Sequence, residues 1–170
     1  MRVLLFTCLL LASPALPAQK KLKVEISAQG DTSWSTSETK IYNSPGGNKA
    51  AGDYLKTSVY KNKDGYKLVL SIQTGRTNMF NIERGAAAEI TLADGSSLTL
   101  PSLRDQAARR LASYYGCFIY AFYALDAATI RDLKSRDITN VSVSTSTGKM
   151  IFPIKSKDGD SIRRLLEKFE

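Results

Sequence analysis

The sequence predicts an α+β fold, mainly an antiparallel β-sheet with a short helix near 127–134 and a C-terminal amphipathic helix over 158–169 packing on the sheet. Apolar and polar residues alternate along several short segments, which is the period of half-buried strands. Two pairs of these segments flank Asp-Gly, a dipeptide that favours tight hairpin turns. Near the end of the chain the apolar spacing becomes helical, at Ile162, Leu165, Leu166 and Phe169. Strands followed by helices are typical of the α+β class.

The first eighteen residues have the three parts of an export signal. Arg2 gives a positive start, residues 3–12 form an apolar run, and small residues lead to Ala18. The run is about half of the ~20 residues that a helix needs to cross a bilayer. We therefore expect residues 1–18 to be removed as a signal peptide and residues 19–170 to form a single domain. The mature protein is then exported, to the periplasm, the cell surface or the medium.

The first half of the expected domain contains one strand, a long polar loop and a hairpin. Residues 22–28 alternate between apolar and polar side chains, as a half-buried strand does. Residues 29–53 are rich in Ser, Thr and Gly, so we expect a mobile polar loop there with one short strand around 40–43. Residues 56–61 and 66–73 then flank an Asp-Gly turn, where glycine accepts a positive φ without steric cost.

A second hairpin and a helix are expected next. Residues 88–92 and 97–100 alternate on either side of the sequence Ala-Asp-Gly-Ser. Pro101 ends the second arm of this hairpin. Apolar residues four apart over 102–115 then predict a helix with a narrow apolar stripe, which Gly116 ends.

The remaining elements alternate between strand and helix. Residues 117–125 are apolar on both faces, which is typical of a central strand. Asp126 is a good N-cap for the helix over 127–134, because its carboxylate accepts hydrogen bonds from the free amides of the first turn. Residues 138–145 and 150–154 are expected to be strands joined by a Thr-Gly turn.

Six motifs follow one another in the second half: Phe80-Asn-Ile-Glu-Arg-Gly85, Ile90-Thr-Leu-Ala-Asp-Gly95, Tyr120-Ala-Phe-Tyr-Ala-Leu-Asp126, Ile130-Arg-Asp-Leu133, Ile138-Thr-Asn-Val-Ser-Val143 and the terminal amphipathic helix. This order resembles a module found in a group of small, exported, uncharacterised bacterial proteins. The resemblance covers about residues 78–170, and it implies a bacterial exported setting and one α+β module. It brings no catalytic residue, and residues 102–116 look like an insertion relative to its plan.

Composition excludes several classes of catalytic and metal site. The chain has no His, which removes Ser-His-Asp triads, Cys-His dyads and His-containing zinc sites. Signal cleavage leaves Cys117 as the single thiol, so neither an internal disulfide nor a Cys-x-x-Cys redox pair can form. Neither of the glycine motifs that bind phosphates and dinucleotides occurs. We therefore expect a protein that is not an enzyme and that uses no metal and no cofactor.

Two groups of side chains are candidates for contacts with a partner. Trp34 lies among Ser and Thr residues, and Tyr114 and Tyr115 open an aromatic-rich stretch that runs to Tyr123. The stretch is either core with a tyrosine rim or an exposed surface for a glycan, peptide or protein, and Trp34 either anchors a loop or contacts a partner. The second group is a basic cluster at the mature N-terminus, which is a solvated tail or an anion-binding segment: Lys20, Lys21 and Lys23.

These observations favour binding over catalysis. Basic residues interleave poorly with the aromatic residues along the sequence, so nucleic acid is not an expected partner. No later apolar run reaches transmembrane length. We expect a non-enzymatic exported interaction or binding module of the bacterial cell envelope, with a protein or an envelope polymer as its partner. An exposed strand edge is a further place for a partner to bind. Two alternatives stay open: a carboxylate-dependent hydrolase of envelope polymers, and a basic protein that binds polyanions or membrane surfaces.

Overall fold

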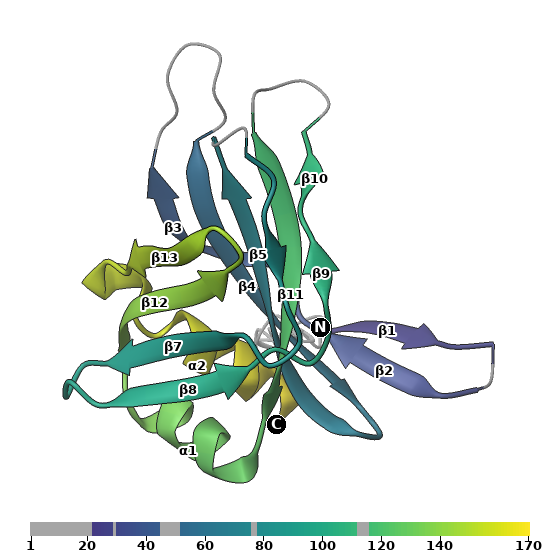
Figure 1. Ribbon diagram of the computed structural model, residues 1–170. Helices are drawn as coiled ribbons and strands as arrows, with labels where there is room; N and C mark the ends of the chain where they lie inside the picture. Colours follow the sequence, from purple (N-terminus) through teal and green to yellow (C-terminus); the bar gives the residue numbers. More distant parts are fainter. Residues whose placement is uncertain (1–21, 29, 45–51, 76–77, 112–115) are drawn as a thin grey trace, which may run out of the picture.

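The computed structural model of the chain describes residues 22–28, 30–44, 52–75, 78–111 and 116–170. Its described part consists of two main antiparallel sheets, with the helices gathered beside the smaller one (Figure 1). One hydrophobic cluster contains residues of both sheets and of the terminal helix. The α+β class with mainly antiparallel strands is therefore confirmed.

The larger sheet has seven strands: β1 (Lys23–Ile26), β2 (Thr32–Ser35), β3 (Thr39–Ser44), β4 (Asp53–Asn62), β5 (Gly65–Thr74), β10 (Arg109–Arg110) and β11 (Cys117–Leu125). Every pairing in it is antiparallel, and the order along the sheet is β1-β2-β4-β5-β11-β10. β3 also pairs with β4, along the half of that strand that β2 leaves free. The long central strands β4, β5 and β11 thus form the body of the sheet.

The smaller sheet has four strands, β7 (Ala87–Leu92), β8 (Ser97–Pro101), β12 (Ile138–Thr145) and β13 (Gly148–Pro153). They are ordered β13-β12-β7-β8, and all pairs are antiparallel. Two very short strands, β6 (Asn81–Ile82) and β9 (Gln106–Ala107), pair with each other. The expected strands over 138–145 and 150–154 are therefore present as β12 and β13.

The helical elements are short: α1 (Ala127–Ser135), η1 (Ser156–Asp158), α2 (Ser161–Leu166) and η2 (Glu167–Phe169), the two η elements being 3₁₀ turns. α1 begins where the sequence predicts, because the Asp126 carboxylate accepts a hydrogen bond from the Thr129 amide at 2.7 Å. The same backbone bond holds the pKa of Asp126 below its ordinary value.

The terminal helix is shorter than the expected span of 158–169. Regular α-helix ends at Leu166, and the last turn tightens into η2. Its apolar side chains still turn inward as the helical spacing predicts, and the buried ones are Ile162, Leu165 and Leu166. The Phe169 ring meets the Tyr66 ring of β5 edge to face, with 5.4 Å between ring centres. This contact joins the end of the chain to the larger sheet.

Both Asp-Gly hairpins form where the sequence predicts them. β4 and β5 pair as far as Asn62 and Gly65, and β7 and β8 pair as far as Thr91 and Ser97. Gly65 has a φ of 109° and Gly95 a φ of 84°, a region that L side chains rarely adopt. The turns therefore help to fix which residues of each hairpin lie opposite one another.

β11 lies next to β10, the edge strand of the larger sheet, and only one of its faces is buried. Along the strand, buried residues alternate with more exposed ones, and the buried set is Cys117, Ile119, Ala121, Tyr123 and Leu125. These residues belong to the same apolar cluster as the smaller sheet. The strand expected over residues 117–125 is therefore present, and the apolar cluster packs against one of its two apolar faces. The aromatic residues of the other face stay partly exposed.

The helix expected over 102–115 is wrong. Residues 102–111 run beside β11 as an irregular sheet edge, in which the Leu103 amide donates to the Phe122 carbonyl at 2.8 Å and β10 pairs with the start of β11. Between these contacts β9 pairs with β6. A helix here would bury little apolar surface, because its stripe is narrow, and Leu103 is 37% exposed in the structure. Hydrogen bonds to a strand edge satisfy the backbone groups that a helix would have paired. Residues 112–115 lie outside the described part of the chain.

The segment 29–53 holds two strands, β2 and β3, where the sequence predicts a polar loop with one short strand. The physical reason is visible at Thr36. Its hydroxyl accepts a hydrogen bond from the Val59 amide at 3.0 Å, and its own amide donates to the Val59 carbonyl at 2.9 Å. Hydroxyl residues here satisfy the backbone of β4 instead of facing water. Residues 29 and 45–51 lie outside the described part.

An ion-pair network joins the β7–β8 turn to the end of α1. Arg136 donates to the Asp94 carboxylate at 2.7 Å and also pairs with Asp132 at 2.6 Å. The other Asp94 oxygen accepts from the Ser96 hydroxyl at 2.6 Å and from the Ser96 amide at 3.0 Å. The bonds from Ser96, followed by that from Arg136, hold the pKa of Asp94 well below its usual range.

Replacing Asp94 is expected to reduce stability in a pH-dependent way. A carboxyl whose pKa is lowered by folding stabilises the fold above its unfolded pKa near 3.8, and this contribution is lost as the pH falls below that value. Asp94→Asn is therefore expected to melt at a lower temperature than the parent at pH 6, with the difference narrowing below pH 3.8. Thermal melts followed by circular dichroism from pH 2 to 7 measure this. Asp64→Asn, in the other hairpin, is the control, and a difference independent of pH contradicts the assignment.

The hydroxyl of Tyr123 provides a second prediction about stability. The side chain is fully buried, its hydroxyl has no hydrogen-bond partner among the described residues, and burial raises the pKa of the phenol. A buried hydroxyl without a partner costs about 1–3 kcal/mol. Tyr123→Phe is expected to leave the free energy of unfolding unchanged or to raise it by about 1 kcal/mol, measured by urea denaturation. A lower free energy of unfolding for Tyr123→Phe than for the parent contradicts this prediction, because it means that the hydroxyl has a hydrogen-bond partner.

Candidate functional site

The face of the larger sheet that points away from the smaller sheet carries aromatic and basic side chains in register. Across β11, β5 and β4, Phe118 lies opposite Gln73 and then Tyr54, and Tyr120 lies opposite Ser71 and then Lys56. Two further rows continue this pattern, Phe122–Val69–Ser58 and Ala124–Lys67–Tyr60. We call this surface the aromatic–basic face and define it by Tyr54, Lys56, Tyr60, Lys67, Phe118, Tyr120 and Phe122, with Lys40, Arg104 and Arg109 at its edges.

The basic groups of the aromatic–basic face lie directly over its rings. The Lys40 and Lys56 ammonium groups lie 5.6 and 5.0 Å from the centre of the Tyr54 ring. Lys67 lies 5.7 Å from the Tyr60 ring. Such contacts occur roughly once per 70–80 residues in proteins, so four on one face is a marked concentration. The face presents π surface and positive charge together.

Arg104 makes the closest of these contacts. Its guanidinium carbon lies 4.0 Å from the centre of the Phe122 ring. The backbone bond between Leu103 and Phe122 holds the segment against β11 and so positions the arginine. A guanidinium stacked on a ring keeps its planar edge available for a carboxylate, sulfate or phosphate.

Two hollows adjoin at this stack. One has a volume of about 360 Å³ and is lined by Tyr60, Lys67, Leu103, Arg104 and Phe122. The other has a volume of about 380 Å³ and lies between the 104–109 segment and the aromatic side chains of β11. Both are lined by Arg104 and Phe122, so they adjoin at this stack, and we refer to the two hollows together as the groove along β11.

Most of the positive charge on this face is not neutralised locally. Lys67 pairs with Asp64 at 3.9 Å, and Lys56 pairs with Glu38 at 3.2 Å. Partial burial opposes the charge of Lys56, but the hydrogen bond and attraction from Glu38 raise its pKa above the ordinary value. Within the described ranges no carboxylate forms an ion pair with Lys40, Arg104 or Arg109. The groove therefore favours an anionic ligand.

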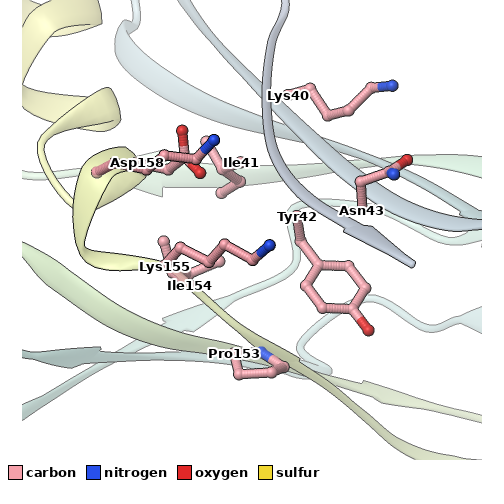
Figure 2. Close-up of a pocket in the computed structure, with 9 residues that line it drawn as sticks. Lys40, Ile41, Tyr42, Asn43, Pro153, Ile154, Lys155 and Asp158 are labelled. Carbon is pink, nitrogen blue, oxygen red and sulfur yellow. The ribbon is translucent and has the colours of Figure 1, made fainter. Parts of the chain in front are cut away.

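A third hollow, of about 450 Å³, lies between β3 and the segment that links β13 to η1 (Figure 2). Three lysines line it, Lys40, Lys155 and Lys157, against a single carboxylate, Asp158. Figure 2 shows Tyr42 and Asn43 on the β3 side and Pro153 on the other. Since Lys40 also belongs to the aromatic–basic face, the basic surface continues around the β3 edge.

None of the site residues proposed from the sequence is placed on this face among the described residues. Trp34 lies in β2, half-buried, opposite Lys61 of β4, and Lys23 is exposed on β1. Both belong to the β1–β2 hairpin and not to the aromatic rows. The other four proposed residues, Tyr114, Tyr115, Lys20 and Lys21, lie outside the described part of the chain.

Sequence reasoning missed the interleaving of basic and aromatic residues, which is present between strands although absent along 117–123. A signal for it exists in the sequence. Tyr54, Lys56, Ser58 and Tyr60 occupy alternate positions of one strand, and pairing across the following turn places Lys67 opposite Tyr60. The statement that these residue types interleave poorly is therefore wrong in three dimensions.

Carboxylates in the described ranges serve mainly to bind arginines and lysines. Asp94 and Asp132 share Arg136, and Asp137 and Asp160 share Arg163. No group of three potential metal ligands is found among the described residues. In the same part of the chain, no helix combines the length and the apolar character that a membrane span requires.

Comparison of the chain with known proteins finds no similar protein. Neither the family models, nor the curated proteins, nor the solved structures contain a match to the chain. The resemblance of residues 78–170 to small exported bacterial proteins stays a prediction. The function is therefore inferred from the chemistry of the aromatic–basic face.

Proposed function

We propose that the protein is a non-enzymatic exported binding module that holds an extended acidic polysaccharide of the cell envelope along the aromatic–basic face. The observation that carries this proposal is the groove along β11, in which Arg104 stacks on Phe122 and aromatic rings lie in register with lysines. Among the described residues this surface offers aromatic rings and cations, which are groups suited to binding an anionic ligand.

The two kinds of side chain suit the two properties of an acidic sugar polymer. The C–H groups on the face of a sugar ring pack on the electron-rich face of an aromatic ring. Carboxylate or sulfate groups on the sugar accept charge-assisted hydrogen bonds from Lys and Arg. Phe118, Tyr120 and Phe122 are two residues apart on one strand, about 7 Å by strand geometry. Arg104 covers the Phe122 ring and Tyr120 is 42% exposed, so Tyr120 is the ring that we expect to contact a sugar directly.

The other features of the chain agree with this setting. The N-terminal sequence favours export, and the net charge of +8 favours an anionic partner. The basic cluster at Lys20, Lys21 and Lys23 is an alternative anion-binding segment, which the experiment below separates from the groove. The hydrolase alternative needs two carboxylates facing a cleft, and the carboxylates that lie together here are held by arginines.

Binding to alginate, a linear polyuronate, tests the proposal, with neutral dextran and a single-stranded oligonucleotide as comparison ligands. Arg104→Ala is expected to weaken alginate binding by about tenfold in isothermal titration calorimetry, because it removes a charge-assisted contact. Arg131→Ala on α1 removes one exposed positive charge elsewhere and is expected to have no such effect. Affinity is expected to fall as salt is raised.

Several outcomes overturn this assignment. Equal weakening by Arg131→Ala means that overall charge, not the groove, binds alginate. A larger effect of Lys23→Ala than of Arg104→Ala moves the site to the basic N-terminal cluster. Preference for the oligonucleotide makes nucleic acid the ligand, and binding of neither polymer rejects the proposal.

The ion pair between Glu38 and Lys56 gives an independent prediction with the opposite sign. Removing the carboxylate frees Lys56 for the ligand, so Glu38→Gln is expected to strengthen alginate binding roughly threefold at low salt. Glu89→Gln is the matched control, because Glu89 also pairs with a lysine, Lys149 at 2.7 Å, on the smaller sheet. If Glu38→Gln and Glu89→Gln strengthen alginate binding equally, the gain in affinity comes from net charge and not from the release of Lys56.

A further inference from the structure

β1 is an edge strand that presents apolar side chains to water. It pairs with β2 on one side, and no described strand pairs with its other side. All four of its residues are exposed, including Val24 at 56% and Ile26 at 71%. Figure 1 shows the β1–β2 hairpin projecting sideways from the rest of the molecule. A projecting apolar edge with free backbone groups is a site for pairing with another strand.

The backbone hydrogen bonds show which residues of β1 face the free edge. The Ser27 amide donates to the Asp31 carbonyl at 2.9 Å, so this pair is hydrogen-bonded across the hairpin. In an antiparallel ladder such pairs alternate with pairs that are not bonded to each other. The odd-numbered residues of β1 therefore bond to β2, and the amides and carbonyls of Val24 and Ile26 point to the free edge.

The sequence of this edge is complementary to itself. If two copies pair antiparallel about Val24, Leu22 lies opposite Ile26 of the other copy and Lys23 lies opposite Glu25. The even-numbered residues then exchange backbone hydrogen bonds, as their orientation requires. In the nearest other registers that also pair even-numbered residues with each other, Lys23 lies opposite Lys23 or Glu25 lies opposite Glu25. Like charges opposite one another are destabilising. Only the Val24 register matches charge and apolar character along the whole strand.

We propose that β1 is a homodimerisation strand, through which two copies of the chain join their larger sheets about a two-fold axis at Val24. Trp34 pairs with Val24 on the neighbouring strand and lies on the same face, so Trp34 and Val24 of both copies form an apolar cluster at the axis. Lys23 and Glu25 of each copy form cross-strand ion pairs on the opposite face. This inference goes beyond the polymer-binding function, and it does not depend on it.

Charge-reversal variants test the register directly. Sedimentation velocity over a range of concentrations is expected to show a monomer–dimer equilibrium for the purified protein. Lys23→Glu and Glu25→Lys are each expected to raise the dimer dissociation constant roughly tenfold or more, because each places like charges opposite one another twice. An equimolar mixture of the two variants is expected to regain dimers, since the mixed pair restores both ion pairs.

This design separates the register from overall charge. Lys23→Glu lowers the net positive charge and Glu25→Lys raises it, so repulsion between basic molecules would change dimerisation in opposite directions. The chain has one Trp, so the emission of Trp34 reports on the axis, and a blue shift is expected at concentrations where dimers form. Circular dichroism confirms that the variants fold. A parent that stays monomeric at millimolar concentration, or a mixture that does not regain dimers, overturns the proposal.

Discussion

Nine consecutive residues of β11 pair with nine of β5, from Cys117 beside Thr74 to Leu125 beside Tyr66. Because side chains alternate between faces, a shift of this pairing by one residue would exchange the core and the outer surface. Phe118 and Tyr120 would then be buried, and Ile119 would face water. The hydrophobic core and the aromatic–basic face are thus two results of one register, which the turn at Gly65 extends to β4.

Basic side chains have different partners in different parts of the molecule. Acidic side chains bind Arg136 and Arg163 near the helices, where they join α1 and α2 to the turns around them. On the aromatic–basic face, by contrast, lysines of the central rows lie over rings, and two of them also pair with carboxylates, Lys56 with Glu38 and Lys67 with Asp64. Contact with a ring holds a cation in place without cancelling its charge. The face remains positive although the chain contains many carboxylates.

Elements specified by local chemistry were predictable from the sequence. The Asp-Gly turns, the Asp126 cap and the apolar side of α2 depend on neighbours in the chain, and the structure has all of them. The structure of residues 102–111 was not predictable in this way, because their backbone bonds include those to β11 and β6. The aromatic–basic face was missed for the same reason, since Lys56 and Tyr120 meet across β5 and are far apart in sequence.

Because buried and exposed residues alternate along β11, substitutions on its outer face and substitutions on its core face have different consequences. Substitution of Phe118, Tyr120 or Phe122 alters the surface but leaves no cavity in the interior, whereas truncation of Ile119 or Tyr123 does. Under the proposed function, ligand preference and stability therefore depend on different positions of the same strand. Substitutions could then change what the strand binds while the interior stays constant. Among descendants of one ancestral chain, the odd-numbered positions of β11 would record common origin and the even-numbered ones would record divergence of specificity.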